Sequence, residues 1–130
     1  MASVDYRIQT PLAKVRGLGS AKSGTEHFWL QRLTAVANLV LAFAFIAIVI
    51  ALAGKDYASA RALIGHPLVA MLLALFVISG CIHMRIGMQV VIEDYVHGTA
   101  KIVAVLANTF FSIIVGAASL FAIIKLAFGG

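Results

Sequence analysis

The sequence predicts an all-α membrane protein with three transmembrane helices, and three observations support this fold class. Of its 130 residues, 62% are hydrophobic and only 12% are charged, which is too few charges for a soluble domain of this size. Three long apolar runs, residues 33–53, 67–84 and 102–124, contain no Asp, Glu, Lys or Arg. Roughly 20 residues in a helix cross a hydrocarbon core of about 30 Å. The short alternating segments of a membrane β-barrel are absent.

The first helix is expected at about residues 30–53, with Thr25 or Ser23 as its N-terminal cap and Gly54 as its stop. Its apolar run is longer than the core of a cleaved signal peptide, which has about 7–15 residues, and it follows a long polar lead. That lead, residues 1–25, contains the stretch GLGSAKSG and predicts a polar arm on the cytoplasmic side. Residues 1–130 are therefore expected to form a single membrane domain.

The second and third helices are expected at about residues 67–92 and 100–126. Pro67 suits the first position of a helix, and Gly98 permits the chain reversal between the two helices. The third helix carries a stripe of small and weakly polar residues at steps of four, four and three: Asn108, Ser112, Gly116 and Ser119. Such a stripe is typical of close helix packing in lipid and favours packing over ligand binding.

The basic residues that give the net charge of +5 gather mainly on one side of the membrane and do not form one patch, which argues against a nucleic-acid partner. Basic residues gather before the first helix or in the connection that follows the second: Arg7, Lys14, Arg16, Lys22, Arg32 and Lys101. The opposite side has fewer: Lys55, Arg61 and Lys125. The positive-inside rule therefore predicts a cytoplasmic or matrix N-terminus and a C-terminus on the opposite side, with some attraction to anionic lipid.

The second helix carries the most informative face. His83 lies within its apolar run, and Asp94 follows eleven residues later, after a rotation of about 1100°, or three turns plus roughly 20°. The two residues therefore share one face of the helix. Ser79, Gly80 and Gly87 flank His83 on that face, so the imidazole has small neighbours and space beside it.

That space has two interpretations. A flat group such as a porphyrin could occupy it, with His83 as an iron ligand. Alternatively, Gly80 and Gly87 admit a neighbouring helix, to which His83 hydrogen-bonds. The other histidines all lie near expected helix ends: His27, His66 and His97. A haem held by two histidines would consequently take its second ligand from another chain.

Asp94 and Tyr95 end the second helix at the cytoplasmic interface. A tyrosine suits the aromatic belt of a membrane, and an acidic residue suits a polar loop. Beside an apolar crevice, the same hydroxyl and carboxylate could instead hydrogen-bond a carbonyl group and exchange protons. Spacing alone leaves both interpretations open.

Two stretches of the sequence resemble a known family. HMRIGMQVVIEDYV, at residues 83–96, and Arg32-Leu33-Thr34-Ala35, which opens the first helix, are similar to the hydrophobic membrane anchor subunit of succinate dehydrogenase, the D-type subunit of respiratory complex II. Three helices, a length near 130 residues and a cytoplasmic N-terminus agree with that family. The resemblance covers nearly the whole chain, and residues 83–95 are its most specific part.

The resemblance implies a site for each motif residue. His83 corresponds to an axial ligand of a haem b, with the haem iron as the only metal expected. Arg32 and His27 correspond to residues near the haem propionates. Tyr95 and Asp94 correspond to the ubiquinone-binding pair.

The resemblance also implies partners: a sister three-helix anchor (a cytochrome b subunit), an iron–sulfur subunit and a flavoprotein subunit. It places the complex in a bacterial or mitochondrial inner membrane, where it oxidises succinate and reduces ubiquinone, with no catalysis expected from this chain alone. Arg85 departs from the family pattern and lies about 200° from His83, where it is expected to extend to the headgroups. The alternatives are an anchor of a quinol:fumarate reductase, another b-type cytochrome subunit, and a structural membrane protein without a cofactor.

Overall fold

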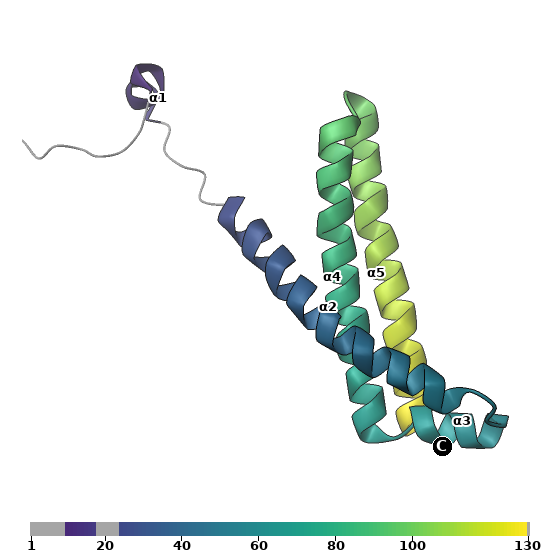
Figure 1. The fold of residues 1–130 in the computed structure, drawn as a ribbon. Helices are drawn as coiled ribbons and strands as arrows, with labels where there is room; N and C mark the ends of the chain where they lie inside the picture. The colour runs from purple at the N-terminus through teal and green to yellow at the C-terminus, as the bar shows by residue number, and fades with distance from the viewer. Residues whose placement is uncertain (1–9, 18–23, 130) are drawn as a thin grey trace, which may run out of the picture.

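The structure, a computed structural model, describes residues 10–17 and 24–129. In these residues it contains five helices and no strand (Figure 1). The helices are α1 (Pro11–Val15), α2 (Gly24–Leu52), α3 (Tyr57–Ile64), α4 (Pro67–Tyr95) and α5 (Thr99–Phe128). The helices α2, α4 and α5 are long and apolar enough to cross a membrane, which confirms the predicted fold class.

The helix ends follow from backbone chemistry at a few positions. Gly54 and Gly98 have φ angles of +75° and +65°, in the left-handed region that glycine adopts without a steric penalty. Pro67 occupies the first turn of α4, and the His66 ring accepts a hydrogen bond from the Leu68 amide at 3.3 Å. Thr25 lies inside α2 rather than capping it. The other expected cap, at residue 23, falls outside the described residues.

The short helix α3 was not predicted from the sequence. It packs against the start of α4 and the end of α5 (Figure 1). This end of the molecule is called here the α3 end. The Arg61 guanidinium donates a 2.6 Å hydrogen bond to the Gly129 carbonyl, which joins α3 to the end of α5. A Cβ atom at Gly65 would lie 2.9 Å from the Leu126 carbonyl oxygen, so only glycine permits this close approach.

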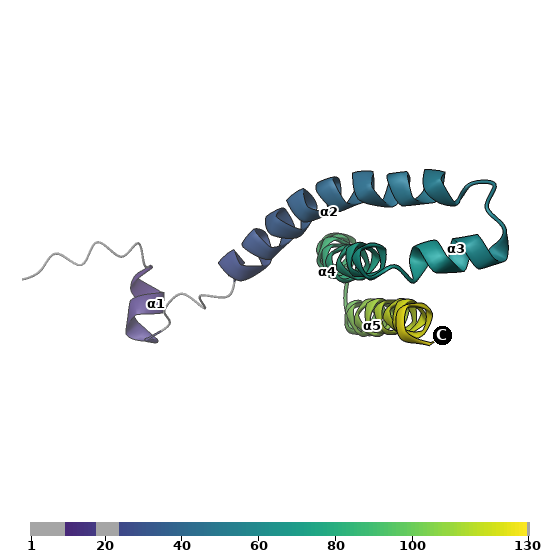
Figure 2. The same ribbon diagram turned by 90° about the horizontal axis from the view of Figure 1, so that it is seen from below.

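The three long helices form a row rather than a closed triangle. Figure 2 shows α4 between α2 and α5, and α4 makes the extensive contacts with both neighbours. The α2 helix crosses α4 obliquely, and its first turns diverge from the last turns of α4 (Figure 1). The divergent end, opposite α3, is called here the Tyr95 end. Each half of α4 therefore has a different environment.

The contacts between helices bury few side chains, and several of these are polar. The buried hydrophobic side chains of the described residues are Ile48, Ala70, Ile86 and Ile92. The buried polar ones are Thr34, Asn108 and Ser112. Such small and polar contacts are typical of helices that associate in lipid, where apolar burial supplies little driving force. Most of the large apolar side chains are exposed, as expected of helices that span a membrane.

The polar stripe of α5 packs against α4, as the sequence predicted. The Asn108 amide donates a 2.9 Å hydrogen bond to the Arg85 carbonyl, and the Ser112 hydroxyl donates a 2.8 Å bond to the Asn108 carbonyl. A Cβ atom at Gly116 would lie 3.4 Å from Cys81 Sγ, so the absent side chain lets the helices approach. The prediction of helix packing for this stripe is confirmed.

Candidate functional site

The contact between α2 and α4 centres on Thr34 and His83. Thr34 Oγ1 lies 3.1 Å from His83 Nδ1, and Thr34 is only 5% exposed. The same hydroxyl lies 2.7 Å from the Leu30 carbonyl oxygen and 3.1 Å from that of Gln31. Ser79, one turn before His83, donates a 3.4 Å hydrogen bond to the Thr34 carbonyl. Two neighbouring polar residues of α4 thus bind a single residue of α2.

Of the two sequence-based interpretations of His83, the hydrogen bond to a neighbouring helix is present. That bond uses only Nδ1, and Nε2 makes no hydrogen bond to any residue that the structure describes. Histidines that ligate metals usually have this arrangement, with one ring nitrogen bound to the protein and the other free for the metal. The helix contact and the ligand role are therefore compatible.

The glycines beside His83 differ in what they face. A Cβ atom at Gly87 would lie 3.3 Å from Gln31 Nε2, so Gly87 admits α2. A Cβ atom at Gly80 would meet nothing within 4 Å, so space is open there. The sequence predicts one open niche beside both glycines, whereas in the structure only the space beside Gly80 is free. The reason is that α2 packs on this face of α4, where the Phe45 and Phe76 rings stack at 5.0 Å.

The α2 side of the contact includes two amide oxygens without a partner. Gln31 Oε1 and Asn38 Oδ1 are buried and accept no hydrogen bond. The two residues lie three before and four after Thr34, so all three share a face of α2. A buried polar group left unpaired costs roughly 1–3 kcal/mol. The polar contact is therefore incomplete within this chain.

These observations fit a haem approached through His83. The imidazole offers one free nitrogen, and Gly80 leaves open space beside it. Among the described residues, no group of three or more His, Cys, Asp or Glu side chains could hold a metal ion. A haem does not need such a group, because the porphyrin provides four ligands and the protein one or two.

Arg32 and His27 do not share a face of α2: Arg32 lies on another face than Thr34, whereas His27 lies on the Thr34 face, two turns nearer the start of the helix. Arg32 is two residues before Thr34, about 200° around the helix, and its guanidinium lies 4.4 Å from the centre of the Phe28 ring. His27 is exposed and lies about 140° from Arg32 around the axis. Within the chain, the structure brings neither residue to His83.

Asp94 and Tyr95 form the last turn of α4, which runs three residues beyond the sequence-based estimate. Both are exposed, Tyr95 to 79%, and neither side chain makes a hydrogen bond to a described residue. The neighbouring Glu93 accepts a 2.8 Å bond from Gln89 Nε2, and its carbonyl accepts a 3.3 Å bond from Lys101 Nζ. The turn is thus held by other residues, and Asp94 and Tyr95 are free for a ligand or partner.

The two groups of candidate residues lie at different depths. Twelve residues separate His83 from Tyr95 along α4, which is about 18 Å along the helix axis.

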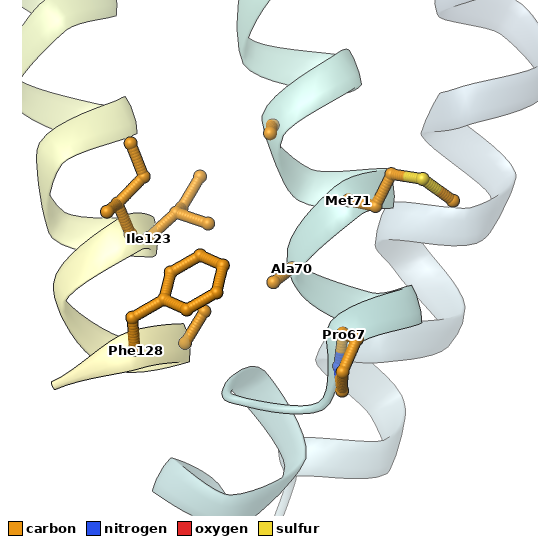
Figure 3. Close-up of a pocket in the computed structure, with 8 residues that line it drawn as sticks. Pro67, Ala70, Met71, Ile123 and Phe128 are labelled. Carbon is orange, nitrogen blue, oxygen red and sulfur yellow. The ribbon is translucent and has the colours of Figure 1, made fainter. Parts of the chain in front are cut away.

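A cavity of about 240 Å³ lies between α4 and α5 at the α3 end, away from both groups (Figure 3). Its lining includes Pro67, Met71 and Phe128 and matches a hydrocarbon chain better than a polar ligand. It contains none of the predicted site residues.

Comparisons with known proteins agree with this architecture. Residues 6–124 match the model of the succinate dehydrogenase/fumarate reductase transmembrane subunit family. The succinate dehydrogenase hydrophobic membrane anchor subunit of Paracoccus denitrificans is 35% identical over 123 residues, which are 95% of each chain. The protein of the same name from Rickettsia bellii is 33% identical over 91 residues, 70% of this chain and 73% of the relative. No solved structure matches. The chain therefore belongs to the family of succinate dehydrogenase/fumarate reductase transmembrane subunits.

Proposed function

We propose that this chain is the D-type anchor of a succinate:ubiquinone oxidoreductase, where it provides one axial ligand of a haem b and part of the ubiquinone site. The observation that carries the proposal is the state of the His83 imidazole, with Nδ1 bound to α2 and Nε2 free. His83 shares a face of α4 with the exposed Asp94 at the end of the helix, and the exposed Tyr95 lies at the same end, about 120° further around the axis. Family membership supports the same assignment.

The haem would be held between this chain and a sister anchor. When bound, the haem can accept and release single electrons near the path to the quinone. His83 would supply one nitrogen ligand from this chain. His27, His66 and His97 lie at helix ends, so the second histidine comes from the cytochrome b subunit. The site is therefore completed by the partner.

Arg32 and His27 would bind the haem propionates from the first turns of α2. The positive charge of Arg32 and the N–H groups of both residues suit carboxylates. The Arg32 guanidinium would exchange its contact with Phe28 for a charge-assisted hydrogen bond, which is the stronger interaction. The two residues lie at different heights and on different faces of α2, so each is proposed for a separate propionate.

Tyr95 and Asp94 would form this chain's part of the ubiquinone site. Reduction of ubiquinone to ubiquinol takes two electrons and two protons, and negative charge builds on the carbonyl oxygens as electrons arrive. The Tyr95 hydroxyl would donate a hydrogen bond to one carbonyl, and that bond strengthens as the charge develops. Asp94 precedes Tyr95 in the same exposed turn, and its carboxylate can pass protons from the aqueous phase. Because both side chains are exposed here, partner subunits must close the pocket.

The Tyr95 end of the molecule would face the cytoplasm or matrix, and the α3 end would face the other side of the inner membrane. Lys101 lies at the Tyr95 end, whereas Lys55, Arg61 and Lys125 lie at the α3 end, and more basic residues precede α2. The iron–sulfur subunit, which carries electrons from the flavoprotein subunit, would therefore dock over Tyr95. The soluble partners would oxidise succinate, and this chain would hold them at the membrane.

Site-directed labelling tests this orientation. The chain has one cysteine, so a Cys81→Ala background permits single cysteines at exposed positions of the two ends. We expect a membrane-impermeant maleimide added to intact cells to label Lys55→Cys but not His97→Cys. Permeabilised cells should show labelling at both positions. The reverse pattern in intact cells would overturn the proposed orientation.

The composition and spectrum of the purified complex test the function itself. Affinity purification through a tag on this chain, from membranes in mild detergent, should recover a flavoprotein, an iron–sulfur protein and a second anchor. Reduced-minus-oxidised spectra should show a b-type haem, and the complex should reduce ubiquinone with succinate. Purification of the chain without these partners, or of a complete complex without haem, would contradict the proposal.

A further inference from the structure

We infer that Thr34 is a positioning residue for His83: its hydroxyl determines which imidazole nitrogen faces the haem iron and holds the ring in place. This inference rests on the proposed ligation of haem by His83. It concerns a residue that neither touches the iron nor belongs to the predicted ligand, propionate or quinone groups. The hydrogen bonds of the buried Thr34 hydroxyl group support it.

The proton of the Thr34 hydroxyl is already used within α2. A hydroxyl group has one hydrogen to donate, and Oγ1 lies 2.7 Å from the Leu30 carbonyl and 3.1 Å from the Gln31 carbonyl. Carbonyl oxygens only accept hydrogen bonds, so the hydroxyl must donate to them. What Oγ1 offers to His83 Nδ1 at 3.1 Å is therefore a lone pair.

It follows that Nδ1 of His83 carries the proton in this contact. In a neutral imidazole one ring nitrogen is protonated and the other has a free lone pair. With the proton on Nδ1, the lone pair is on Nε2, and Nε2 is the nitrogen without a partner in the described residues. Thr34 thus selects the tautomer that can ligate iron through Nε2.

The same contact limits movement of the ring. Thr34 is 5% exposed, and its β-branched side chain has few available rotamers. Ser79, on the same face of α4 one turn from His83, binds the Thr34 carbonyl. Residue 34 is therefore held to α4 through both its backbone and its side chain. An imidazole bound to such a fixed acceptor keeps one orientation before the cofactor is present.

A purely structural role accounts less well for these contacts. The α4–α5 contact shows the simpler solution, in which the Asn108 amide binds the Arg85 carbonyl directly. On α2, the amides of Gln31 and Asn38 flank Thr34 on the same face, yet each leaves its buried oxygen unpaired. The bond that does form is the one that orients the imidazole. The Thr34–His83 bond fixes the orientation of the imidazole. A bond that only holds two helices together would not need to do so.

The inference predicts a change in the haem itself. An imidazole whose N–H is bound to an acceptor is a stronger donor to iron, and such outer partners tune both metal affinity and potential. In Thr34→Val the side-chain shape is kept and the acceptor is lost. We expect an upward shift of the haem midpoint potential, an altered low-spin ferric signal in electron paramagnetic resonance, and about tenfold easier loss of haem during detergent washing.

Two further variants of the assembled complex control for helix packing. Thr34→Ser retains the hydroxyl and should restore the wild-type potential and signal. Thr109 on α5 has the same kind of hydroxyl bond, 2.9 Å to the Val105 carbonyl, but no contact with His83, so Thr109→Val should leave the haem unchanged. All variants are compared at equal content of the four subunits, which separates an effect on the haem from a failure to assemble.

The outcomes separate this inference from the proposed function. If the wild-type complex contains haem that His83→Ala removes, but Thr34→Val keeps the wild-type potential, signal and haem retention, the role of Thr34 is wrong and haem ligation by His83 stands. An equal potential shift in Thr109→Val would also overturn it, by showing a general effect of threonine loss. A wild-type complex without haem would overturn the proposed ligand itself.

Discussion

Replacement of His83 by alanine is expected to remove haem b from the assembled complex. Loss of an outer-shell partner typically lowers metal affinity about 10- to 100-fold, and loss of the ligand itself should lower it by at least as much. Difference spectra of the purified complex, normalised to bound flavin, measure the haem that remains. Succinate oxidation with an artificial acceptor should persist, because His83 lies within α4, twelve residues before the Tyr95 end where the soluble subunits are proposed to dock.

The matched control for this prediction is His66→Asn at the other end of α4. His66 caps the helix through its ring, and asparagine is among the best capping residues, so the helix should keep its N-terminus. The haem content of this variant should equal that of the wild type. Retention of a wild-type haem spectrum in His83→Ala would show that another residue ligates the iron. Equal losses in both variants would indicate that any histidine change disrupts the bundle.

Replacement of Tyr95 by phenylalanine should slow ubiquinone reduction by about 10- to 100-fold, the value expected for a lost hydrogen bond of roughly 1.5–3 kcal/mol to a group that becomes charged. The ring remains, so packing at the membrane interface is preserved. Transfer of electrons from succinate to an artificial acceptor should be unaffected, because that step ends before the quinone site. The measurement is the ratio of the two activities in the same membranes.

The chain offers a control with nearly the same exposure. Tyr57 is 78% exposed and lies on α3 at the opposite end, whereas Tyr95 is 79% exposed at the end of α4. Tyr57→Phe should leave both activities unchanged. If Tyr95→Phe reduces ubiquinone as fast as the wild type, Tyr95 is not the hydrogen-bond donor and the proposed quinone site must be revised.

The membrane architecture could be predicted from the sequence because it depends on patterns along the chain. Apolar runs of sufficient length predicted α2, α4 and α5, and Gly54, Pro67 and Gly98 stand where these helices end or begin. The Asn108 stripe predicted close helix packing, because small polar residues at helical spacing have few other uses in lipid, and the structure identifies α4 as the helix it packs against. These features need no knowledge of how the helices cross.

The site could be predicted only in part from the sequence, because it depends on which helix packs against each face of α2 and α4. The sequence placed His83 among small residues, but it did not show that α2 covers the Gly87 side and leaves the Gly80 side open. Thr34 was quoted only as part of a motif. A signal was available in its neighbours, since Gln31 and Asn38 place two more polar groups on its face of an otherwise apolar helix. The helix α3 was missed because its eight residues lie in a short polar connection.

The arrangement of the helices in a row has a consequence for the order of events during synthesis. Each long helix packs mainly on the one that precedes it in the chain, so α4 can dock on α2 as soon as it enters the bilayer. The bonds that orient His83 involve only residues that precede it or the residue itself. The imidazole can therefore be aligned before α5 is synthesised and before any sister chain arrives. Cofactor insertion would then begin from a preformed half-site.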